Sequence, residues 1–285
     1  MITLSSHAAT TINAVNRFAY GANIGWMDWR GDTANGVIIG AFVCSGHLYA
    51  ANVGWISLGD GTPANGVHYL NNSGADFGVN HDGAGNLSGY AYGANIGWIT
   101  FTNRASDGSV YDGPKVNLLT GRLSGFVWSA NCGWISLSSA EGFVQTDTMD
   151  CGPDLDADGI PDMWELQFAT NLAILDGASD PDGDGATNAE EFDADTNPRD
   201  AASRLRLTSI HRPGSAAPVT LSWSSSSTRQ YRIRTSADVA APLPWADSGL
   251  GLIPPDAGAT TSRILPPPVD PHRFYLIETI KPLQP

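Results

Sequence analysis

The sequence predicts an all-β protein that begins with a repeat domain, and three observations support this. An eleven-residue cassette occurs four times, with its central asparagine at 23, 52, 95 and 131. Side chains on both sides of each asparagine alternate between two faces, which is the two-residue period of a β-strand. The chain of 285 residues contains 32 glycines and only 15% charged residues, as is typical of a loop-rich globular protein. Each cassette is therefore predicted to be a β-hairpin that turns at its asparagine.

The two faces of each predicted hairpin differ in composition. The cassettes are AYGANIGWMDW (19–29), LYAANVGWISL (48–58), AYGANIGWITF (91–101) and VWSANCGWISL (127–137). One face holds tryptophan, tyrosine and phenylalanine, and the other holds aliphatic residues. We expect both faces to be buried, because repeated aromatic residues at fixed positions are usually core; a platform for stacking sugar rings is the alternative. We expect the asparagines to take the left-handed backbone conformation of a turn.

The spacing of the cassettes, 29, 43 and 36 residues, is that of stacked or cyclic repeats. A third strand is predicted before each later hairpin, from Gly36, Phe77 and Pro114. We therefore expect a four-repeat β domain over 17–148, either an irregular barrel or a compact propeller-like ring. It follows a segment, 1–16, in which Ser6-His7-Ala8 resembles the end of a signal peptide.

The negative charge of the chain is concentrated in one short segment. The net charge is −3 over 1–146 (8 acidic, 5 basic), −15 over 147–200 (16 and 1) and +4 over 201–285 (5 and 9). This balance argues against nucleic acid as a partner. No apolar run of eighteen or more residues predicts a membrane span.

The acidic segment contains two loops with the spacing of calcium ligands. Oxygen ligands at positions 1, 3, 5, 7, 9 and 12, with glycine at 6, enclose a hard cation. The first loop supplies Asp154, Asp156, Asp158, the Ile160 carbonyl, Asp162 and Glu165, and the second supplies Asp180, Asp182, Asp184, the Ala186 carbonyl, Asn188 and Glu191. We predict a calcium-binding connector over 149–200 that holds two or more ions. The segment resembles the thrombospondin type 3 and dockerin-like calcium repeats of secreted bacterial proteins, and this resemblance implies short helices at 163–169 and 189–192.

The last part of the chain, 201–285, predicts a β-sandwich. Short alternating segments such as PVTLSW and RQYRIRT are separated by Pro, Ser and Gly every eight to twelve residues. Trp223, Tyr231, Trp245 and the Phe274-Tyr275 pair resemble those of fibronectin type III-like modules.

Three cysteines are present, and the sequence predicts that two of them pair. Cys44 and Cys132 occupy apolar positions of the cassette pattern, so both thiols are expected to be buried and to form a disulfide, as suits an oxidising compartment. A bridge between Cys132 and Cys151 is the alternative.

Histidines raise the hypothesis of a copper site. The cassettes resemble repeats of secreted bacterial proteins with the pattern (Tyr/Trp)-x-x-Asn-(Ile/Val)-Gly-Trp-(Ile/Val), which are distantly similar to surface copper-binding proteins of the MopE and CorA type. His47, His68 and His81 are the candidate ligands, since imidazole suits copper. No tryptophan lies two residues before a histidine, unlike in those proteins. Binding is expected at His47 and in the long segment from Gly59 to His81, where the repeats differ.

The sequence contains no nucleophile elbow, zinc-protease motif or phosphate-binding loop. We therefore expect a secreted or cell-surface, non-enzymatic, calcium-stabilised binding or structural protein. Two alternatives are a copper-acquisition protein and a carbohydrate-binding accessory protein. A cell-surface glycan or protein would be its partner, besides metal ions.

Overall fold

The computed structural model describes residues 10–32, 34–105, 108–268 and 272–283. The chain forms two compact units. The first comprises Met1–Leu155, Pro161–Gln167 and Leu283–Pro285, and the second comprises Asp156–Ile160 and Phe168–Pro282. The segment 149–200, predicted as a separate connector, is divided between the two units.

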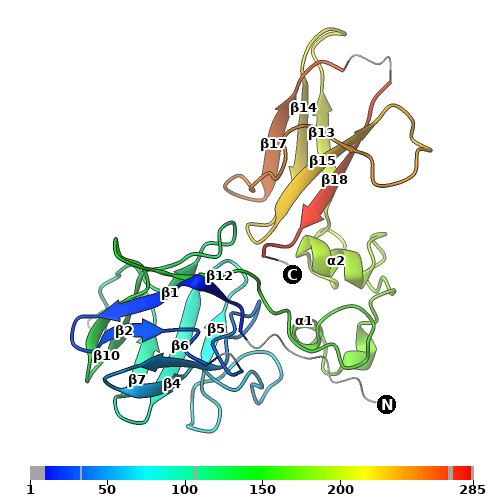
Figure 1. Cartoon of the computed structure of the whole chain (residues 1–285). Helices are drawn as coiled ribbons and strands as arrows, with labels where there is room; N and C mark the ends of the chain where they lie inside the picture. The colour runs from blue at the N-terminus through cyan, green and yellow to red at the C-terminus, as the bar shows by residue number, and fades with distance from the viewer. Residues whose placement is uncertain (1–9, 33, 106–107, 269–271, 284–285) are drawn as a thin grey trace. The chain divides into compact units, whose positions relative to one another are not determined.

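The first unit contains a closed eight-stranded antiparallel barrel (Figure 1). Each strand pairs with the next, and the last pairs with the first through Tyr20 and Ser136. The all-β prediction is thus confirmed, and of the two predicted topologies the chain adopts the barrel. The barrel strands are β1 (Ile12–Gly21), β2 (Gly25–Asp28), β3 (His47–Ala50), β4 (Gly54–Ser57), β6 (Leu87–Gly93), β7 (Gly97–Phe101), β10 (Phe126–Ser129) and β11 (Gly133–Ser136).

Shorter strands extend the barrel at its edges. Strand β12 (Val144–Thr146) pairs with β1 and β5 (Val79–His81) pairs with β6, whereas β8 (Lys115–Val116) and β9 (Leu123–Ser124) form a separate two-stranded sheet. The third strands predicted from Phe77 and Pro114 are therefore present but short. The one predicted from Gly36 is reduced to isolated bridges.

Strand β1 begins earlier than the sequence indicates. Ile12 is fully buried in the barrel core, so the predicted N-terminal segment 1–16 contributes its last residues to the barrel. The Ser6-His7-Ala8 pattern lies outside the described residues.

Only the aliphatic face of the hairpins is buried. Met27, Ile56, Ile99 and Ile135 are at most 2% exposed and fill the interior. An eight-stranded barrel has an interior just wide enough for such side chains. The tryptophans of the cassettes, Trp26, Trp55, Trp98 and Trp134, lie outside and are 43–47% exposed. The expectation that both faces are buried is wrong for the aromatic face.

The four cassette asparagines link neighbouring hairpins in a ring. Each donates a hydrogen bond from Nδ2 to the backbone carbonyl of the residue after the neighbouring hairpin's asparagine, at 2.9–3.0 Å. The pairs are Asn23 to Cys132, Asn52 to Ile24, Asn95 to Val53, and Asn131 to Ile96. The ring therefore holds one end of the barrel closed.

The left-handed residue of each turn is glycine, not asparagine. Gly25, Gly54, Gly97 and Gly133 have φ between 70° and 85°, whereas none of the cassette asparagines has a positive φ. An ideal Cβ on each glycine would lie 3.3–3.6 Å from the amide nitrogen of the neighbouring hairpin's asparagine. The cassette asparagine is thus required for its side-chain hydrogen bond, and the glycine for its backbone.

The long segment between the second and third hairpins is packed and internally hydrogen-bonded. Tyr69 is 2% exposed and contacts Met163 of helix α1 (Asp162–Phe168) in a small hydrophobic cluster. The Asn80 side chain bonds both the amide and the carbonyl of Tyr69, at 2.8 and 2.9 Å. The segment predicted to bind a ligand therefore has a structural role over much of its length.

The second unit contains two three-stranded antiparallel sheets with a shared core. One sheet has the order β13-β14-β17 and the other β16-β15-β18. Trp223 and Tyr231, from one sheet each, are fully buried with ring centroids 5.7 Å apart. The strands are β13 (Leu207–His211), β14 (Val219–Ser224), β15 (Gln230–Ser236), β16 (Ala246–Asp247), β17 (Thr260–Leu265) and β18 (Phe274–Ile280).

Two short helical elements precede these sheets. The 3-10 helix η1 spans Leu172–Ile174, and helix α2 spans Asn188–Ala194. Thr187 and Glu190 form a capping box at the start of α2. Lys281 of the second unit forms an ion pair with Asp193 at 2.6 Å, which ties α2 to the strands. No helix in the described ranges is long and apolar enough to cross a membrane.

All three cysteines are free thiols. Cys44 and Cys132 are buried, as their apolar positions predict, but the expected bridge between them is not formed. Cys132 lies in the turn of β10–β11, whereas Cys44 precedes β3 by three residues and lies toward the other end of the barrel. At about 3.3 Å per strand residue the two are separated by much more than the roughly 7 Å that a disulfide can bridge. Cys151 is also unpaired.

Candidate functional site

The outer surface of the barrel carries a repeated row of side chains where one hairpin meets the next. Each row crosses four adjacent strands in register and reads aromatic, small polar, aromatic, tryptophan, with two exceptions. At one junction histidine replaces the first aromatic residue, and at another aspartate is the small polar residue. The rows are Phe18-Asp28-Tyr49-Trp55, His47-Ser57-Tyr92-Trp98, Tyr90-Thr100-Trp128-Trp134 and Phe126-Ser136-Tyr20-Trp26.

We call these rows together the aromatic belt. In three of them the tyrosine and the tryptophan that end the row pack in nearly the same way, with ring centroids 4.8–5.0 Å apart and planes at 58–59°. The small second member of each row lies between the first and third members, which are therefore two strand spacings, about 9.5 Å, apart. A flat ring between two aromatic side chains needs about 7 to 8 Å. Each junction therefore has the dimensions of a slot for one ring-shaped ligand.

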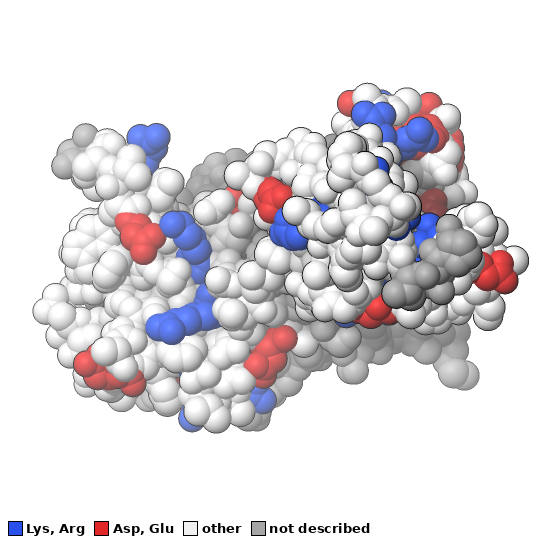
Figure 2. All heavy atoms as spheres, turned by 90° about the horizontal axis from the view of Figure 1, so that it is seen from above, with Lys and Arg blue, Asp and Glu red and all other residues white. Residues whose placement is uncertain are grey.

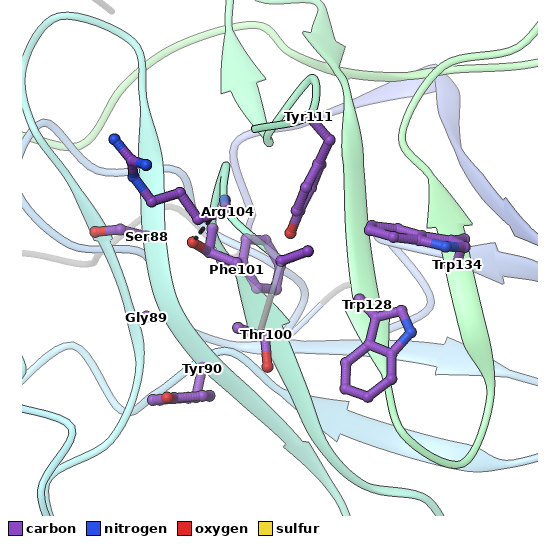
Figure 3. Close-up of a pocket in the computed structure, with 11 residues that line it drawn as sticks. Ser88, Gly89, Tyr90, Thr100, Phe101, Arg104, Tyr111, Trp128 and Trp134 are labelled. Carbon is purple, nitrogen blue, oxygen red and sulfur yellow. Dashed lines mark hydrogen bonds between the residues drawn. The ribbon is translucent and has the colours of Figure 1, made fainter. Parts of the chain in front are cut away.

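The slot between the third and fourth hairpins opens into a pocket of about 670 Å³ (Figure 3). Strands β7 and β10 pair only at Thr100-Trp128 and Ile99-Ser129. Beyond this point the amide of Phe126 donates to Asp112 instead, at 2.9 Å. The strands separate there because residues 111–112 lie between them. The volume is within the range of about 300 to 1,000 Å³ that is usual for ligand pockets.

Tyr111 completes the wall of this pocket. Its ring packs edge-on against Trp134, with centroids 4.7 Å apart, and in Figure 3 its hydroxyl points toward the floor at Phe101 and Thr100. The hydroxyl oxygen is buried and has no hydrogen-bond partner among the described residues. Burial raises the pKa of Tyr111, so the hydroxyl stays protonated and can donate. Nothing in the cassette pattern pointed to Tyr111, because it lies outside the cassettes.

The other polar groups of the pocket are also uncharged, with one exception. Ser88, Thr100 and Thr102 contribute hydroxyls, and Arg104 lies at the rim. These groups can donate and accept hydrogen bonds, but they form no paired acid and base. The pocket is thus suited to binding by stacking and hydrogen bonding.

The second predicted calcium loop brings its carboxylates together. Oxygens of Asp180, Asp182 and Asp184 lie within 4.8 Å of one another. Both oxygens of Asp180 accept loop amides, from Gly183 at 2.8 Å and Gly185 at 3.0 Å. Asp182 and Asp184 each have one buried oxygen without a hydrogen-bond partner among the described residues.

Helix α2 places two buried side chains with oxygen atoms beside this loop. Asn188 and Glu191 are fully buried. Nδ2 of Asn188 donates to Asp176 O at 2.8 Å and to Ser179 Oγ at 2.9 Å, whereas its Oδ1 has no partner within the described ranges. Burial, together with the charges of the three loop aspartates, raises the pKa of Glu191 to about 7. A set of buried, unpartnered oxygens at this spacing fits a divalent cation.

The first predicted calcium loop is shared between the two units. Asp154, Asp162 and Glu165 belong to the first unit, whereas Asp156, Asp158 and Ile160 belong to the second. Within the first unit, Asp162 and Glu165 are buried on α1, and Asp162 accepts the amide of Leu155 at 2.8 Å. The predicted helices at both loops are confirmed within about two residues.

The structure does not bring the three candidate copper ligands together. Among the described residues, the clusters that could hold a metal ion consist of carboxylates only. His47 and His68 are exposed, and His81 is 5% exposed on β5. Nδ1 of His81 lies 3.0 Å from the carbonyl oxygen of Ala41, and burial lowers its pKa. His47 instead occupies the first position of a belt row.

Charged side chains are sparse on the face shown in Figure 2. Uncharged atoms predominate there, and basic and acidic side chains are interspersed. In the belt itself Asp28 is paired with Arg17 at 3.3 Å. The members of the belt rows other than Asp28 are thus aromatic, histidine or neutral polar side chains.

Comparison with known proteins assigns no relative. No family model, no curated protein and no solved structure matches the chain significantly. The function must therefore be argued from the geometry.

Proposed function

We propose that the protein is a secreted or surface-associated carbohydrate-binding protein that acts without catalysis, and that its ligand surface is the aromatic belt. The observation that supports this most is the repeated exposure of tryptophan and tyrosine. Eight belt side chains at equivalent positions, Tyr20, Trp26, Tyr49, Trp55, Tyr92, Trp98, Trp128 and Trp134, are 39–47% exposed.

Exposed aromatic residues at regular spacing indicate an interaction surface. Large apolar side chains are usually scattered singly on a protein surface, and a contiguous set marks a binding site. Sugar rings have an apolar face and a hydroxylated rim, so they match an aromatic ring beside a small hydroxyl residue. Ser57, Thr100 and Ser136 supply that hydroxyl in three of the rows.

The test is retention of the full chain in native gels that contain soluble polysaccharides. The panel consists of neutral xyloglucan, laminarin and soluble starch, and anionic alginate and polygalacturonate. We expect retardation by at least one of them. Mobility that none of the five alters would refute carbohydrate binding by this protein.

We further propose that calcium occupies both acidic loops and stabilises the chain. In the second loop the buried oxygens of Asn188 and Glu191 support this proposal. Replacing Glu191 with Gln removes one charged ligand, and it should weaken calcium binding at one site by about tenfold or more in calorimetric titration. Glu190→Gln is the matched control, because Glu190 caps the helix and its carboxylate bonds Thr187. Equal effects of the two changes would count against a site in this loop.

Two finer structural assignments belong with this proposal. The four hairpins with their asparagine ring represent four copies of one repeat, and the two sheets of the second unit represent a fibronectin III-like sandwich.

A further inference from the structure

The four slots of the aromatic belt are not equivalent. Three of them contain a charged residue, a histidine or a hydroxyl that is already hydrogen-bonded. In the first row, Asp28 is charged and paired with Arg17. In the second row, His47 replaces the aromatic residue. In the fourth row, the Ser136 hydroxyl already donates to the carbonyl of Ser138, at 2.8 Å.

In the third row both walls are aromatic and the hydroxyl between them is available. Tyr90 and Trp128 are 37% and 41% exposed, on either side of Thr100. The Thr100 side chain makes no hydrogen bond within the described part of the chain, and the Tyr111 hydroxyl is buried beside it without a partner. This is also the slot that opens into the 670 Å³ pocket.

We infer that this pocket binds one ring of a neutral polysaccharide, with the ring between Tyr90 and Trp128 and its hydroxyls on Thr100 and Tyr111. This inference rests on the proposed function and names its principal site. A buried hydroxyl without a partner costs free energy in the free protein. A sugar hydroxyl that reaches Tyr111 removes that cost, so this contact favours a polyhydroxylated ligand over a purely apolar one.

Charge favours a neutral ligand over an anionic one. Residues 1–146 carry a net charge of −3. Among the described residues that line the pocket, Arg104 is the only charged one, and it is exposed at the rim, where water screens it. A carboxylated sugar would therefore meet weak attraction at the rim and net repulsion from the rest of the barrel unit.

The experiment measures affinity by native gel retardation with the same five polysaccharides, on the full chain with calcium. Trp128→Ala removes one wall of the pocket, and it should weaken binding of the neutral ligand about thirtyfold or more, as expected for a binding hot spot. Tyr49→Ala is the matched control, because Tyr49 has the same cassette position and is 39% exposed, but it lies in the first row. It should weaken binding about tenfold less than Trp128→Ala does, because the first row is not the principal site.

Tyr111→Phe tests the hydroxyl without altering the fold. Because that hydroxyl has no partner among the described residues, its loss should leave thermal stability unchanged or higher, while affinity falls about two- to tenfold. Equal losses in Trp128→Ala and Tyr49→Ala, or an unchanged affinity in Tyr111→Phe, would overturn the assignment of this pocket while carbohydrate binding itself stands. Tighter binding of alginate or polygalacturonate than of the neutral polysaccharides would refute the inference that the ligand is neutral. Absence of binding to all five would overturn the proposed function as well.

Discussion

Trp26 and Trp29 are separated by only two residues, and the barrel places the first outside and the second inside. Trp26 is 45% exposed in the belt, whereas Trp29 is 1% exposed in the core. Truncating a fully buried tryptophan to alanine typically costs about 3 to 5 kcal/mol, since it removes burial and leaves a cavity. Trp26 buries just over half as much of its side chain as Trp29 does, and its replacement by alanine would leave no closed cavity. Its truncation should therefore cost about 1 to 2 kcal/mol.

The assay is urea unfolding of Trp26→Ala and Trp29→Ala at saturating calcium, followed by circular dichroism. We expect the midpoint for Trp29→Ala to fall well below that for Trp26→Ala, with similar slopes. Equal losses of 3 kcal/mol or more in both variants would show that the aromatic face is also core, and would remove the belt as a binding surface.

Three further predictions follow from the barrel. Asn52→Ala should lower the free energy of unfolding by about 1 kcal/mol, because it removes one hydrogen bond of the ring. Asn52→Asp should destabilise more, because a carboxylate cannot donate to the neighbouring carbonyl and places a negative charge beside it. If Asn52→Asp is as stable as the unchanged protein, asparagine acts only as a turn residue. His81 has a lowered folded-state pKa, so the unfolded chain binds the proton more readily, and stability should fall as pH drops below about 6.5; His81→Gln should lose this dependence, measured by thermal unfolding at fixed calcium. Thiol titration should find three reactive thiols in urea. In the native protein Cys44 and Cys132 should react slowly, because both are buried and burial raises the pKa of Cys44 to about 12. Fewer than three reactive thiols in unreduced, urea-unfolded protein would mean that a disulfide forms.

The sequence by itself determined the local elements of this protein. The cassette period predicted hairpins, the alternation placed Trp26 and Met27 on opposite faces, and the spacing of oxygens predicted the sharp glycine turn after Asp180. These follow from backbone geometry within a dozen residues, so no distant contact is needed to specify them.

Only the tertiary structure decided which face is inside. Alternation distinguishes two faces but does not say which one is buried when both are apolar. Closing eight strands leaves a narrow interior, which Met27, Ile56 and Ile99 fill together with Trp29. The alternate face, which carries Trp26, Trp55, Trp98 and Trp134, consequently lies outside.

The role of the asparagines was likewise decided by closure. The carbonyl that Asn23 bonds belongs to Cys132, which is 109 residues away in sequence and becomes its neighbour only when β11 meets β1. The same closure keeps Cys44 and Cys132 apart, and it gives Tyr111 its position over Trp134. Contacts between distant segments depend on how the hairpins assemble, so the sequence pattern within one hairpin does not predict them.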